Sequence, residues 1–167
     1  MVKNKIKIEG ARIIFKNFQG KGDEYNSQGN RNFGVILDDL TAAKLEEDGW
    51  YVRRLRPRED DPEQYATPWL KVKVNYDRER NLIPIVVMIT SRGKKTLTEE
   101  QIGQLDWTSI EKADLIISPY NYPARNGRPA GVSAYLKSLY ITVIEDELEL
   151  KYADIKDIDE NEEIPFD

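Results

Sequence analysis

The segment Trp69-Leu-Lys-Val-Lys-Val-Asn-Tyr76 is the clearest strand in the chain, because apolar and polar residues alternate along it. Successive side chains of a β-strand point to opposite faces of the sheet. One face would therefore carry Leu70, Val72, Val74 and Tyr76, and the other would carry Trp69, Lys71, Lys73 and Asn75. The first set is suited to a core, whereas the second places an indole ring beside two ammonium groups. The segment thus predicts a sheet with one buried face and one exposed, aromatic and basic face.

The residues on either side of this segment also read mostly as strands. We expect them near Ile6 and Ile8, near Ile13 and Phe15 after a bend at Gly10, and over residues 32–37, 50–55, 84–90, 113–122 and 132–144. Asn126-Gly127 has the composition of a hairpin turn between the last two.

Two short helices are expected between the strands. Asp38 or Asp39 would cap the first, whose apolar positions are Leu40, Ala43 and Leu45 and which would end at Gly49. The second would cover residues 97–105, with Thr98 and Gln101 spaced as a capping box. Many short strands with two inserted helices favour a mainly β chain that forms an OB-like antiparallel β-barrel, with a β-sandwich as the alternative.

The chain has no cysteine and no histidine among its 167 residues. This composition excludes disulfides, histidine-ligated zinc and the Ser-His-Asp and Cys-His catalytic arrangements, so we expect a protein that is not an enzyme. We also expect no metal, no cofactor and a reducing compartment, the cytoplasm. No apolar run is long enough to span a membrane, and the first residues lack the pattern of a secretory signal.

Charge is distributed unevenly along the sequence. Residues 145–167 carry a net charge of −9, whereas residues 1–144 carry a net charge of +4. Beyond Lys151 the apolar content falls to a level typical of disorder. We therefore divide the chain into an OB-like binding domain at residues 1–151 and a disordered acidic tail at residues 152–167.

Aromatic and basic residues recur together along the predicted domain. Unpaired nucleic acid needs this mixture, because its bases stack on rings while Lys and Arg neutralise its phosphates. Besides Trp69, Lys71 and Lys73, the candidates are Arg54 and Arg56, Tyr120, Tyr122, Arg125 and Arg128, Tyr135 and Lys137, and, around a glycine-containing loop, Phe18, Tyr25 and Arg31. The recurrence favours a nucleic-acid groove over the ordinary alternative, a solvated lysine face with Trp69 tucked beneath a loop.

The acidic tail ends in a small apolar group, Ile164-Pro165-Phe166. Its negative charge suits it to the basic groove when no nucleic acid is bound. The apolar group suits a pocket on a partner protein. The simpler alternative is a solubilising tail.

Two parts of the chain resemble bacteriophage-encoded OB-fold single-stranded DNA-binding proteins. In the body these are Tyr25-Asn26 through Gly29, Arg31 and Phe33, and the segment Ser133-Ala-Tyr-Leu-Lys-Ser-Leu-Tyr140. The acidic end is similar to the tail that recruits replication and repair enzymes, although Asp167 follows the phenylalanine that ends bacterial tails. The resemblance implies an OB barrel that coats single-stranded DNA without sequence preference in the host-cell cytoplasm. It also implies replication or recombination proteins as partners of the tail.

Other classes of function are compatible with parts of the sequence. A protein-interaction adaptor or an acidic DNA mimic would explain the tail without any bound DNA. A Mg²⁺-dependent nuclease could use Glu149 and Lys151 with Asp106 or Asp114, because Mg²⁺ needs only oxygen ligands. Formation of a homo-oligomer is compatible with all of these functions.

Overall fold

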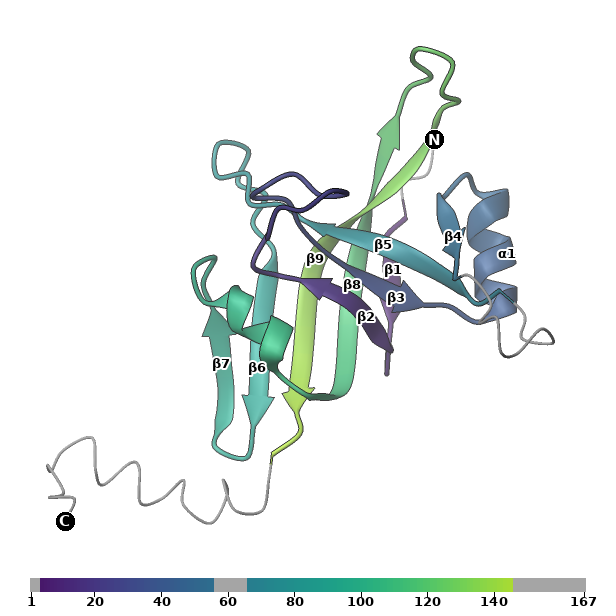
Figure 1. The fold of residues 1–167 in the computed structure, drawn as a ribbon. Coiled ribbons are helices and arrows are strands. Elements are labelled where there is room, and N and C mark those ends of the chain that lie inside the picture. The colour runs from purple at the N-terminus through teal and green to yellow at the C-terminus, as the bar shows by residue number, and fades with distance from the viewer. Residues whose placement is uncertain (1–3, 56–65, 146–167) are drawn as a thin grey trace, which may run out of the picture.

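The computed structural model describes residues 4–55 and 66–145 (Figure 1). Its strands are β1 (Ile6–Ile8), β2 (Ile13–Asn17), β3 (Arg31–Ile36), β4 (Val52–Arg54), β5 (Pro68–Val74), β6 (Ile85–Thr90), β7 (Gly93–Leu97), β8 (Ile110–Tyr122) and β9 (Gly131–Val143). One α-helix, α1 (Asp39–Glu47), and one 3₁₀-helix, η1 (Ile102–Trp107), complete the described elements. The predicted mainly β chain with two short helices is confirmed.

The strands form one curled sheet whose two end strands are neighbours in the chain. The order is β1-β8-β9-β5-β3-β2, and the bend between β1 and β2 contains Gly10 with a φ of 62°. On one side of this bend Ala11 N donates to Ala113 O at 2.7 Å, and on the other Ile36 N donates to Arg12 O at 3.1 Å. The bent segment therefore bonds to both ends of the sheet, as expected for a partly open OB-like barrel. A sandwich of two sheets is excluded.

The sheet was predicted to be antiparallel, but it contains two parallel pairs of strands. Strand β9 runs parallel to β5 through its first half and parallel to β6 through its second half. Turn residues in the sequence indicate hairpins between neighbouring strands, but they carry no information about pairing between strands far apart. Strand β6 also pairs with β7 on its other side, so it is a central strand of the sheet.

The buried face of β5 lies where the alternation predicted it. Leu70 and Val72 are at most 1% exposed and pair with Val35 and Phe33 of β3 inside the barrel. Phe18 also belongs to this core, since it is fully buried and stacks on Phe33 with ring centroids 5.1 Å apart. The prediction that Phe18 contacts nucleic acid was therefore wrong, because its ring is sealed inside the barrel.

The two helices differ in detail from the prediction. Asp38 caps α1 by accepting a hydrogen bond from Thr41 N at 2.7 Å, as expected. The helix buries Ala42 and Leu45, whereas Leu40 is 84% exposed, because only one narrow side of this short helix meets the sheet.

The second helix is shifted relative to the predicted range. Leu97 ends β7, and the side chain of Gln101 accepts a hydrogen bond from Thr98 N at 3.0 Å in the turn before η1. The predicted Thr98–Gln101 pair thus closes a turn instead of starting a helix at residue 97.

The hairpin of β8 and β9 projects beyond the rest of the sheet (Figure 1). Its turn has positive φ at Asn126 (50°) and Gly127 (80°), the combination that a two-residue hairpin turn requires. The predicted turn is confirmed. No helix within the described ranges is long and apolar enough to cross a membrane.

The position of Phe18 gives a stability prediction. Replacing this buried ring by alanine should lower the free energy of unfolding by about 3–5 kcal/mol through lost burial and a residual cavity. Denaturant unfolding of Phe18→Ala measures the loss, and Tyr25→Ala is the control because Tyr25 is 90% exposed. A loss no larger than that of the control would contradict the core assignment.

Candidate nucleic-acid interface

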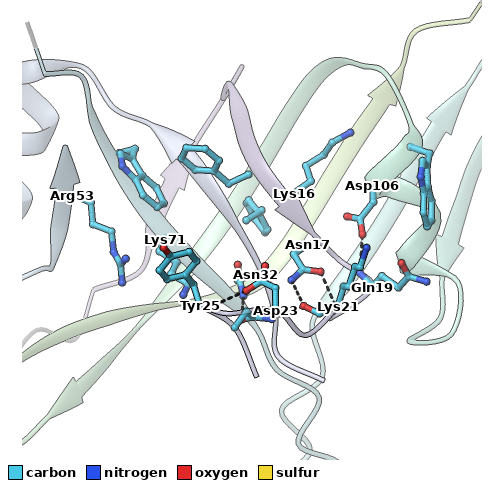
Figure 2. Close-up of a pocket in the computed structure, with 15 residues that line it drawn as sticks. Lys16, Asn17, Gln19, Lys21, Asp23, Tyr25, Asn32, Arg53, Lys71 and Asp106 are labelled. Atoms are coloured by element: carbon cyan, nitrogen blue, oxygen red, sulfur yellow. Dashed lines mark hydrogen bonds between the residues drawn. The ribbon is translucent and has the colours of Figure 1, made fainter. Parts of the chain in front are cut away.

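A groove with a volume of about 560 Å³ runs across the outer faces of β2, β3 and β5, the β2–β3 loop and the end of η1. Its walls consist of Phe15, Lys16, Asn17, Gln19, Lys21, Asp23, Tyr25, Asn26, Asn32, Phe33, Arg53, Trp69, Lys71, Asp106 and Trp107. Figure 2 shows Arg53 and Lys71 toward one end of the groove and Lys16 and Asp106 toward the other. Aromatic rings and cations thus share one trough.

Trp69 lines this groove and contacts residues of three neighbouring strands. A Cβ placed on Gly34 of β3 would be only 2.8 Å from Cε3 of Trp69, so the indole packs directly over the glycine backbone. The ring of Phe15 meets the indole edge-to-face with centroids 5.0 Å apart. The guanidinium of Arg53 lies 5.6 Å from the indole centroid. Trp69 is therefore held on the sheet surface and is not part of the core, as predicted.

The cations of the groove lie close to one another. Burial lowers the pKa of Lys71, and the positive charges of Arg53 and Lys73 lower this pKa further. Within residues 4–55 and 66–145, none of these three side chains forms an ion pair. Their mutual repulsion would be relieved by a bound anion such as a phosphate.

The β2–β3 loop presents Tyr25 to the groove. The side-chain amide of Asn26 donates to Lys21 O at 2.9 Å and to Asn30 O at 3.0 Å, and its oxygen accepts from the Asn32 side chain at 3.1 Å. These bonds fix the loop internally. They leave Tyr25 90% exposed, with its ring available for stacking.

A second contact region fixes η1 and with it Trp107. Lys16 Nζ donates to Leu105 O at 2.9 Å and to Thr108 O at 2.7 Å, while the Asp106 carboxylate accepts from Phe18 N at 2.7 Å. Burial lowers the pKa of Lys16, and the charge of Asp106 opposes this change. Trp107 is 74% exposed at the edge of the groove.

A smaller hollow of about 250 Å³ adjoins the groove and shares Asn26, Asn32 and Lys71 with it. Lys73 and Tyr135, both predicted, lie in this hollow with the ammonium 5.8 Å from the ring centroid.

Two further predicted residues lie at or beside this hollow. Tyr120 contacts Tyr135 edge-to-face at 5.5 Å and is half exposed. Arg31 also lines the hollow, but it pairs with Glu99 at 3.1 Å, so its charge is partly compensated.

Three predicted residues, Tyr122, Arg125 and Arg128, lie on the projecting hairpin, outside the groove and the adjoining hollow. The guanidinium of Arg128 lies 4.5 Å from the ring centroid of Tyr122, and Arg125 pairs with Arg128 through backbone hydrogen bonds of 3.0 and 2.9 Å. Any contact they make with a ligand of the groove would require a strand long enough to reach the hairpin.

Lys137 is the extra residue of a bulge in β9, because Ile116 and Ile117 of β8 pair with Ser138 and Leu136. A hydrogen bond from Lys5, together with the positive charge of that residue, lowers the pKa of Lys137. The structure therefore places Lys137 in a pair of neighbouring lysines outside both hollows.

Arg54 does not line the groove, whereas its neighbour Arg53 does. Arg54 forms an ion pair with Glu46 of α1, a partner that strand alternation could not reveal. Arg53 instead lies over the rings of Tyr51 and Trp69, at 4.9 and 5.6 Å from their centroids. Arg56 and the tail residues Ile164, Pro165 and Phe166 lie outside the described residues.

Phe15 and Trp107 also line the groove, although neither was predicted to contact nucleic acid. Phe15 was counted with the apolar face of its strand, and the bulge that turns it outward left no clear sequence signal. Trp107 could have been noticed as a lone aromatic residue in the polar stretch Asp106-Trp-Thr-Ser109.

The carboxylates considered for a nuclease have structural partners. Asp106 holds the backbone of Phe18, and Asp114 accepts from Gly10 N at 2.8 Å. Glu149 and Lys151 lie outside the described residues. Within the part of the chain that the structure describes, no three Asp or Glu side chains are placed to hold a metal ion.

A comparison with solved structures found single-stranded DNA-binding proteins of phages. The single-stranded DNA-binding protein from bacteriophage Enc34 in complex with ssDNA aligns with a TM-score of 0.52 and 12% identity, over 85% of this chain and 88% of that chain. The crystal structure of gp2.5, a single-stranded DNA-binding protein encoded by bacteriophage T7, aligns with a TM-score of 0.40 and 14% identity. This alignment covers 99% of this chain and 99% of that chain. A comparison with curated protein sequences gave no match. At this identity the Enc34 structure shows a shared fold.

The family comparison covers almost the whole sequence. Residues 1–165 match the family described as "Putative phage ssDNA-binding domain". This match includes the groove, the adjoining hollow and the projecting hairpin. The chain therefore belongs to this family of phage ssDNA-binding domains.

Proposed function

We propose that this protein binds single-stranded DNA in the groove over β2, β3 and β5, with little preference for base sequence. The observation that carries the proposal is a set of rings, exposed at Phe15, Tyr25 and Trp107 and partly buried at Trp69. These rings share one trough with the cations Lys21, Arg53 and Lys71. Family membership supports the same function independently.

The rings favour an unpaired strand over a duplex. In a duplex the faces of the bases are covered by their neighbours, whereas the bases of a single strand can stack on protein side chains. Every base has a flat face, so stacking tolerates any sequence. The absence of sequence preference follows from using ring faces in place of hydrogen bonds to base edges.

The cations supply the affinity for the DNA backbone. Lys71 joins the groove to the adjoining hollow, where Lys73 lies beside Tyr135. A strand that continues past Tyr120 would reach the hairpin, where Arg125 and Arg128 could hold its phosphates. Neutralising several phosphates releases counterions, so binding should weaken steeply as the salt concentration rises.

The role is binding without catalysis, and the protein would coat and protect single strands during phage replication or recombination in the host-cell cytoplasm. The acidic tail, residues 152–167, would compete with DNA for the groove and recruit replication or recombination proteins through Ile164, Pro165 and Phe166. A protein-interaction adaptor is the alternative. Arg53, Lys71 and Lys73 form no ion pair with another described residue, which argues against the adaptor.

The indole of Trp69 gives the first functional prediction. Trp69→Ala should weaken binding of a single-stranded oligonucleotide about tenfold or more, because one stacking platform is worth about 1–3 kcal/mol. Fluorescence anisotropy of a labelled oligonucleotide measures this change, and circular dichroism checks that the variant folds. Tyr140→Ala is the control, since Tyr140 is a partly exposed aromatic outside both hollows. Equal affinities for Trp69→Ala and the control would contradict the site.

The tail gives the second functional prediction. Deleting residues 154–167 should leave the affinity for single-stranded DNA unchanged or raise it at low salt, because the deletion removes negative charge that competes with phosphate. The same anisotropy titration measures the effect, and a tail of equal length with its acidic residues changed to Asn and Gln separates charge from length. Weaker binding by the truncated protein would exclude competition by the tail.

A further inference from the structure

Phe15 has a backbone conformation that is unusual for a bulky residue. Its φ is 50°, in the left-handed region. Within the described residues, the other two positive-φ positions that are not glycine are Asn81 and Asn126. Asparagine tolerates this region because its side chain bonds to the local backbone, whereas a phenylalanine there is strained. The conformation at Phe15 therefore needs a reason other than local preference.

A β-bulge in β2 produces this conformation. Ile14 pairs with Gly34 and Asn17 pairs with Asn32, so both Phe15 and Lys16 lie opposite one residue of β3. The bulge sends the two side chains in different directions. Lys16 reaches the carbonyls at the end of η1, and Phe15 reaches the outer face beside Trp69.

Core packing does not account for the ring of Phe15. The residue is 60% exposed, and its ring meets the ring of Trp69 edge-to-face on the outer face of the sheet. The bulge also does not require this side chain, because glycine adopts positive φ without strain. Glycine at this position would keep the contacts of Lys16 with η1 and remove an exposed ring.

We infer that Phe15 is a base-stacking residue of the DNA groove, held in a left-handed conformation at a cost in stability. This inference rests on the proposed function and deepens it. The exposed ring of Phe15 and the indole of Trp69 would receive adjacent bases of the bound strand. Strained residues that persist in a fold are concentrated at binding sites, where the surrounding structure holds them in place.

Three substitutions separate the ring from the backbone strain. Phe15→Ala removes the ring and keeps the strain, Phe15→Gly removes both, and Phe15→Tyr keeps both. We expect the glycine and alanine variants to bind single-stranded DNA about tenfold more weakly than wild type, and the tyrosine variant to bind within about twofold. We expect the glycine variant to melt at least about 2 °C above the alanine variant.

Anisotropy titrations and thermal unfolding measure these quantities. Asn81→Gly is the control at a relaxed positive-φ position, and it should leave DNA affinity unchanged. Wild-type affinity in Phe15→Gly would overturn the stacking role while leaving the proposed function intact. A glycine variant no more stable than the alanine variant would overturn the strain. If the wild type failed to bind DNA, the proposed function would fall together with this inference.

Discussion

The packing of Trp69 over Gly34 is the contact on which the groove depends. Because Gly34 has no side chain, the indole can lie against the backbone of β3 at a distance that a Cβ would forbid. Phe15 and Arg53 then contact the same ring from β2 and β4. Residues of four strands thus meet at one indole. Any side chain at residue 34 would displace that ring. Phe15 and Arg53 would then lose the ring that both of them contact.

Strand β5 contributes residues to both the core and the groove. Leu70 and Val72 of β5 are buried against β3, while Lys71 points to the opposite face. A slip of one residue in the pairing of β3 with β5 would exchange these two faces. The apolar pairs Phe33–Val72 and Val35–Leu70 fix the register, so the folding of the barrel also determines which residues can meet the ligand.

Strand alternation predicted the faces of β5, and Asn126-Gly127 predicted the hairpin turn, because both depend only on neighbouring residues. The errors arose where a residue depends on distant partners. Phe18 follows the bulged strand into the core, where it stacks on Phe33. The parallel pairing of β9 has the same origin, since no local pattern records which strands far apart in the sequence will pair.

Tryptophan fluorescence during titration with a single-stranded oligonucleotide tests the central claim most directly. Of the three tryptophans, Trp50 is buried, whereas Trp69 and Trp107 line the groove. Bases stacking on the groove should quench the emission of these two residues at low salt, with an affinity that falls steeply as salt is added and is far lower for duplex. Unchanged emission with excess single strand in dilute buffer would contradict the account, because no base would then lie against either indole.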